Sequence, residues 1–172
     1  YVILERRDNI GGTWDLFKYP GIRSDSDMFT LGFRFKPWTS SRSIADGASI
    51  WNYINEAATE NGINKHIRTG HRVTVADWSD ADNRYTITVE HDGEQKQITC
   101  NFLSVCSGYY NYDEGYSPTF AGAEDFTGQI IHPQHWPEDL DYADKKIVVV
   151  GSGATAVTLI PSLVDGGAGH VT

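Results

Sequence analysis

The stretch KIVVVGSGATAVTLIPSL, residues 146–163, decides the fold class of this chain. Residues 145–150, which contain the apolar run Ile147–Val150, predict a buried strand. Residues 151–153 predict a turn, and residues 154–164 predict a helix. A strand that passes through a glycine turn into a helix is the repeating unit of α/β proteins with a parallel sheet. We therefore expect a Rossmann-like α/β fold.

The turn in this stretch carries the pattern G-x-G-x-x-A through Gly151, Gly153 and Ala156, with Ser152 between the glycines. The first glycine permits a tight turn, the second lets a pyrophosphate approach the backbone, and the small third residue lets helix and strand pack closely. The alternative is an ordinary glycine turn, but the flanking strand and helix favour dinucleotide binding. The residue that would read the ribose lies ~20 positions further on, at or beyond Thr172.

Glu5 ends an apolar strand, Tyr1–Leu4, where an acidic side chain would accept hydrogen bonds from a ribose. The sequence GGTW at 11–14 follows it, which favours this role over that of a surface glutamate. The glycine turn expected ~20 residues earlier is absent, so we expect a fragment that lacks parts of two nucleotide-binding units. Two such units indicate two dinucleotides, as in a flavoprotein that a nicotinamide reduces.

Between these units the sequence predicts one long helix and an antiparallel meander inserted in the parallel sheet. Apolar residues recur at helical spacing from 49 to 61, with Asp46 or Ser49 as the cap. Alternation over 71–100, with a hairpin signal at 92–93, predicts the meander. Residues 102–108, FLSVCSG, form a continuous apolar run that predicts a strand buried on both faces.

The composition excludes several classes of protein. A formal charge of -9 argues against a nucleic-acid binder, because phosphate neutralisation needs a surplus of basic residues. Cys100 and Cys106 lie too far apart along an extended chain for a disulfide, and we expect both to be reduced core residues. No apolar run is long enough to cross a membrane, and we expect a cytoplasmic protein.

The segment FTGQIIHPQHWPE, residues 126–138, matches the pattern F-x-G-x-x-x-H-x-x-x-W-P-[DE] at every fixed position. This pattern is the fingerprint of Baeyer-Villiger monooxygenases, the class B flavoprotein monooxygenases, and the chain resembles that family. Three further segments are similar to this family as well: GGTW at 11–14, YPGIRSDSD at 19–27 and CSGYYNYDEGY at 106–116. Their sequences look closest to those of the ethionamide-activating subgroup.

The resemblance implies a flavin enzyme in which NADPH reduces FAD and O2 then forms a C4a-peroxyflavin. This intermediate would attack a ketone carbonyl and give an ester or lactone, and it could also oxygenate the sulfur of a sulfide or thioamide. One alternative is an N- or S-oxygenating flavin-containing monooxygenase, whose fingerprint lacks the ending Trp136-Pro137. Another is a catalytically silent fragment that acts as a structural or binding module. A homo-oligomer is compatible with the sequence.

The resemblance also assigns the candidate site residues. Glu5 would contact the FAD ribose, the segment Gly11, Gly12, Thr13 and Trp14 would line the flavin, and Gly108 would belong to the cofactor site. Asp25 would orient an active-site arginine that lies beyond Thr172, with Asp27 as the competing carboxylate.

The two histidines of the fingerprint stand three positions apart, but no further ligand at a recognisable spacing completes a zinc site. We therefore expect no metal. The resemblance divides the chain into an FAD-binding domain at 1–125, a linker at 126–144, and the start of an NADPH-binding domain at 145–172. By resemblance, His132 and Trp136 would fix the linker so that the NADPH-binding domain can rotate over the FAD-binding domain. His135 would be incidental.

Overall fold

The computed structural model describes residues 1–172 and shows a mixed α/β protein with both parallel and antiparallel strand pairs. The chain divides into two compact units. The first comprises Tyr1–Gly11 and Ile54–Tyr109, and the second comprises Gly12–Tyr53 and Tyr110–Thr172. No helix combines the length and the hydropathy that a membrane span requires.

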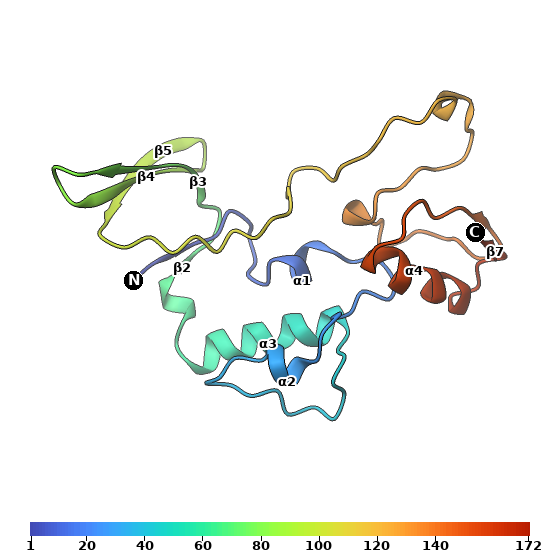
Figure 1. Ribbon diagram of the computed structural model, residues 1–172, viewed down its shortest axis with the longest axis horizontal. Helices are drawn as coiled ribbons and strands as arrows, with labels where there is room; N and C mark the ends of the chain where they lie inside the picture. Colours follow the sequence, from blue (N-terminus) through green and yellow to red (C-terminus); the bar gives the residue numbers. More distant parts are fainter. The chain divides into compact units, whose positions relative to one another are not determined.

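The first unit contains the predicted antiparallel meander (Figure 1). It consists of β3 (Arg72–Ser79), β4 (Arg84–His91) and β5 (Glu94–Cys100), paired in that order. The turn between β4 and β5 is Asp92-Gly93, and both residues have positive φ, as expected for this hairpin signal. Ile87 and Val89 share the buried face of β4, which confirms the alternation.

A short parallel pair ends at Glu5 in the same unit. Strand β1 (Ile3–Leu4) pairs with β2 (Ile67–Arg68), which follows the 3-10 turn η1 (Asn64–His66). The Glu5 N–H then donates to the Arg68 carbonyl at 3.0 Å. The acidic residue is thereby fixed at the strand end.

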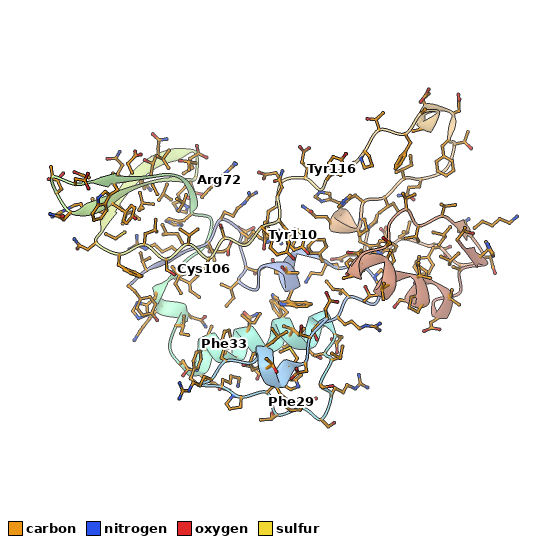
Figure 2. The ribbon with its side chains drawn as sticks, viewed as in Figure 1. Phe29, Phe33, Arg72, Cys106, Tyr110 and Tyr116 are labelled. Atoms are coloured by element: carbon orange, nitrogen blue, oxygen red, sulfur yellow. The ribbon has the colours of Figure 1, made fainter.

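Residues 102–108 do not form the buried strand that their apolar run predicts. They are irregular in the structure, Phe102 is 85% exposed, and Cys106 lies on this extended stretch with its thiol exposed (Figure 2). A strand buried on both faces needs neighbours that satisfy its backbone groups. Because β1 pairs only with β2, these residues have no partner strand. Cys106 is therefore free, as expected, but it is not a core residue, whereas Cys100 is partly buried in β5.

Helix α3 (Gly47–Glu60) confirms the predicted long helix, and Asp46 caps it. The Asp46 Oδ1 atom accepts the Ser49 N–H at 2.8 Å, and Oδ2 accepts the Ser49 hydroxyl at 2.7 Å. Tyr53 is buried on this helix, whereas Trp78 on β3 is 46% exposed.

The second unit begins with a loop that holds two short helices, α1 (Thr13–Leu16) and α2 (Met28–Leu31). Its core is a cluster formed by Leu16, Phe17 and Tyr19 from the first loop and by Leu159 and Leu163 from helix α4 (Ala154–Asp165). The long connector, residues 110–144, contributes only the 3-10 turns η2 (Ala123–Asp125) and η3 (Pro133–His135).

A parallel strand-helix-strand unit completes this part of the chain. Strand β6 (Lys146–Ile147) leads through the glycine turn into α4 and pairs with β7 (His170–Val171). The strand is shorter than the apolar run predicts, and Val148 and Val150 are exposed. Ile147 and Val149 pack against the core cluster, so one face of the run is covered and the other is open. The predicted buried strand is therefore buried on one face only.

Candidate functional site

The turn between β6 and α4 has the backbone that its glycines predict. Gly151 has φ +145°, which side chains rarely adopt, and a Cβ atom at Gly151 or Gly153 would meet no atom within 4 Å. Ala156 is buried, so its small side chain lets the helix pack closely. The open surface over the glycines fits the close approach of a pyrophosphate.

The start of α4 also leaves hydrogen-bond donors for an anion. Gly153 is its N-cap, so no side chain caps the helix, and its first turn contains no acidic residue. The first N–H groups of a helix lack partners within the helix and attract negative charge. The strand, glycines and helix of this turn together fit a dinucleotide phosphate.

The candidate flavin segment lies in the loop that enters α1. Gly11 and Gly12 both have positive φ, and Gly12 is the N-cap of this short helix. Thr13 and Trp14 are partly buried, while the next residues along the helix enter the core cluster. The segment is thus anchored at one end by burial.

Glu5 accepts a backbone hydrogen bond in its own loop, since its Oε1 atom lies 2.9 Å from the Arg7 nitrogen. A carboxylate has two acceptor oxygens, so this bond leaves one for a ribose hydroxyl. Gly108, assigned to the same cofactor, is exposed with φ +72° and has open space around its Cα.

The two competing aspartates differ in their surroundings. Asp27 caps α2, because Oδ1 accepts the Thr30 N–H at 2.9 Å and Oδ2 accepts the Thr30 hydroxyl at 2.9 Å. The bond from the Thr30 backbone, followed by that from its hydroxyl, holds the pKa of Asp27 below its usual range. Asp25 is exposed and takes no part in such a cap. Asp27 therefore has a structural role, and Asp25 is the carboxylate available to a partner.

The fingerprint segment is organised by close packing of rings on glycines. Gly128 has no side chain where the ring of Phe126 folds back over it, and Gly115 has none where the ring of His132 lies. A Cβ atom at either glycine would overlap the ring where it now lies, so a side chain there would displace the ring. Phe126 and Gly128, two fixed positions of the fingerprint, thus contact each other locally.

His132 also begins the turn η3. Its Nδ1 atom accepts the Gln134 N–H at 3.2 Å, and Pro133 occupies the first position of the turn. Trp136 follows the turn and packs against the core cluster, with its ring 6.3 Å from that of Tyr142. His132 and Trp136 therefore connect this segment to two different places in the second unit, Gly115 and the cluster.

Gln134 is a residue that sequence reasoning missed. It is buried, and its side-chain amide donates to the Asn111 carbonyl at 2.8 Å, which ties the segment to the start of the connector. Its position between the two histidines of the fingerprint is the only signal that could have singled it out. His135 is exposed, its ring is 6.5 Å from that of His132, and no group of ligands suitable for a metal ion occurs in the structure.

The structure brings some of the predicted residues together within one unit. His132, Trp136 and the turn at 151–156 all belong to the second unit, and Trp136 and α4 share the core cluster. Glu5, Gly11 and Gly108 belong to the first unit.

The model of one protein family, described as flavin-binding monooxygenase-like, matches residues 42–167. The chain is 87% identical over its full length to the FAD-containing monooxygenase EthA of Mycolicibacterium smegmatis, and it spans 35% of that relative's length.

The chain is also similar to solved structures of monooxygenases. An oxidized steroid monooxygenase bound to NADP matches 98% of the chain with a TM-score of 0.82 and 28% identity, and the match covers 32% of that protein. A cyclohexanone monooxygenase bound to cyclohexanone matches 99% with a TM-score of 0.80 and 26% identity, covering 32% of its length. The chain belongs to the flavin-binding monooxygenase-like family.

Proposed function

We propose that this chain is part of an FAD- and NADPH-dependent monooxygenase that inserts one oxygen atom of O2 next to a ketone carbonyl. The observation that carries the proposal is the fingerprint at 126–138, in which His132 lies on Gly115 and Trp136 packs against the core cluster that also contains residues of α4. A relative that is 87% identical is named an FAD-containing monooxygenase, which supports the flavin.

The turn at 151–156 would hold the pyrophosphate of NADPH. Gly151 and Gly153 supply the open backbone, the N–H groups of Ser152 and of the first turn of α4 supply donors, and Ala156 keeps the helix close. A similar solved structure is a monooxygenase bound to NADP, which supports this nucleotide.

The FAD would be held by residues from both ends of its predicted domain, residues 1–125. Glu5 would accept from the ribose, Gly11, Gly12, Thr13 and Trp14 would line the flavin, and Gly108 would allow close approach of the cofactor. When bound, FAD supplies the redox chemistry that lets O2 react.

The chain's own contribution to the reaction is orientation. Asp25, exposed on the loop after Gly21, would orient a cationic side chain from elsewhere in the protein. His132 and Trp136 would fix the linker 126–144 between the FAD domain and an NADPH domain that starts at 145–172. In this role His132 neither gives nor takes a proton.

For the substrate we propose a ketone, which would yield an ester or lactone, with a sulfide or thioamide as a second class. Support for a ketone comes from a similar monooxygenase that was solved with cyclohexanone bound. A cytoplasmic location stays a prediction from the sequence.

The test uses the full-length protein, purified and loaded with FAD. NADPH oxidation should rise when a cyclic ketone is added, and mass spectrometry should detect the corresponding lactone. Ketone-independent NADPH oxidation without lactone would contradict the proposed reaction, and oxygenation of a sulfide alone would favour the N- or S-oxygenating alternative.

A further inference from the structure

A tight turn in the second unit lies directly against helix α4. The turn is Tyr19-Pro20-Gly21-Ile22, in which the Ile22 N–H donates to the Tyr19 carbonyl at 3.3 Å. Proline at the second position and glycine with φ +83° at the third are the pattern of a type II β-turn. In Figure 1 the chain leaves α1, reaches α4 and then returns to α2.

The contact is closest at Gly21. A Cβ atom there would overlap the Ser162 hydroxyl and the Thr158 carbonyl oxygen, and would lie only 2.9 Å from the Ser162 Cβ atom. The hydroxyl could rotate away, but a backbone carbonyl within a helix cannot. Any side chain at position 21 would therefore push the turn and the helix apart.

A second residue of the turn meets the same side of the helix. The Tyr19 and Thr158 hydroxyls are buried and lie 3.4 Å apart. The two contacted helix residues, Thr158 and Ser162, stand one helical turn apart, so the turn at 19–22 contacts two successive turns of α4.

The turn contacts α4 on either side of a proline within the helix. Pro161 lies inside the helix and has no N–H to donate, which removes one backbone hydrogen bond. The Thr158 and Ser162 hydroxyls bond back to helix carbonyls at 3.0 and 3.2 Å, a pattern that bends helices. An outside contact beside the missing backbone bond therefore helps to hold this helix in one geometry.

We propose that Gly21 is a positioning residue for NADPH, an inference that rests on the proposed function. The start of α4 carries the proposed pyrophosphate site, and four residues after Gly21 the loop reaches Asp25. The fit of Gly21 against α4 sets the spacing between the nucleotide turn and the loop of Asp25. A looser contact would leave both sites formed but wrongly spaced.

The test compares Gly21→Ala with Gly122→Ala in the full-length, FAD-loaded protein. Gly122 is a matched control, because its φ of +81° imposes the same backbone strain but a Cβ atom there would meet nothing within 4 Å. We expect Gly21→Ala to raise the Kd for NADP+ roughly tenfold and to divert reducing equivalents from product to hydrogen peroxide, with FAD content unchanged. Gly122→Ala should match the wild type in both measurements.

Equal NADP+ affinity and equal coupling in the two variants would overturn the positioning role. If Gly21→Ala does not fold with FAD, Ser162→Val adds bulk to the same contact from the helix side and should raise the Kd in the same way; an unchanged Kd there would also refute the proposal. A wild-type protein that binds neither FAD nor NADP+ would instead contradict the proposed function.

Discussion

Asp25 and Asp27 stand two positions apart in one loop, and the structure separates their tasks. Both carboxylate oxygens of Asp27 accept hydrogen bonds from Thr30, whereas Asp25 is exposed. The sequence left the choice between them open, because both are acidic residues in a turn-rich segment. The choice depended on where α2 begins, and a four-residue helix leaves no periodic signal.

We predict that Asp25→Ala lowers oxygenation in the full-length protein roughly 10- to 100-fold while FAD content stays the same, because a displaced partner group misplaces the reacting atoms. Product formation under saturating NADPH is the measurement. Asp27→Ala is the control: it should weaken α2 and leave the product formed per NADPH unchanged. Equal losses in both variants would contradict the special role of Asp25.

Asp46 gives a prediction about acid stability. Hydrogen bonds from the Ser49 hydroxyl and then the Ser49 N–H hold the pKa of Asp46 below its usual range. A carboxylate whose pKa is lowered by folding stabilises the protein above the pKa of the unfolded state, and this stabilisation is lost as pH falls through the folded pKa. The loss from this residue therefore lies below about pH 4.

Asp46→Ala should lower stability by about 1 kcal/mol at neutral pH. Asp46→Asn should keep most of the cap, because an amide oxygen also accepts, but should remove this residue's part of the acid dependence. Denaturant unfolding at several pH values measures both effects. An acid limb as steep in Asp46→Asn as in the wild type would show that this cap does not titrate as described.

At the scale of elements, the linker segment around η3 is held at both ends. His132 accepts the Gln134 N–H and lies on Gly115, and Trp136 packs against the core cluster. The sequence predicted that these two residues fix the linker. It could not predict that His132 lies on Gly115, since Gly115 comes from a stretch without periodicity.

His132→Ala removes the acceptor for Gln134 and the ring that covers Gly115, so the linker should loosen. We expect FAD to remain bound, while more of the NADPH consumed yields hydrogen peroxide rather than product. Peroxide and product per NADPH are the measurement, and His135→Ala, which changes an exposed side chain, is the control. Coupling equal to that of the wild type in His132→Ala would refute the hypothesis.

Elements with strong local periodicity were predictable from sequence. The alternation of β3, β4 and β5 and the helical spacing of α3 and α4 are confirmed, because each pattern follows from one buried face. The sequence did not predict the exposure of residues 102–108, Val148 and Val150. Burial of a strand depends on neighbouring strands and helices rather than on its own residues alone.

At the scale of the whole molecule, the core cluster joins parts of the second unit that are far apart in sequence. The cluster combines residues from 16–19, Trp136 and helix α4. Leu163 of α4 is fully buried in it. The sequence predicted each segment as part of a nucleotide-binding fold. It gave no sign that the loop after α1 packs on α4.

Leu163→Ala should therefore lower stability by about 3 kcal/mol through the cavity it leaves. Because α4 carries the proposed NADPH turn, NADP+ affinity should fall with it. Val164→Ala, at the neighbouring exposed position, should change stability by less than about 0.5 kcal/mol. Thermal unfolding and NADP+ titration of both full-length variants check the difference, and similar losses in the two would argue against the cluster as the core of this unit.

The most direct measurement of the central claim follows the oxygen atom itself. The full-length, FAD-loaded protein is given NADPH, a cyclic ketone and isotopically labelled O2, and the product is analysed by mass spectrometry. We expect a lactone that carries one labelled oxygen atom, formed with the consumption of one NADPH. Unlabelled product, or NADPH consumption that yields only hydrogen peroxide, would contradict it.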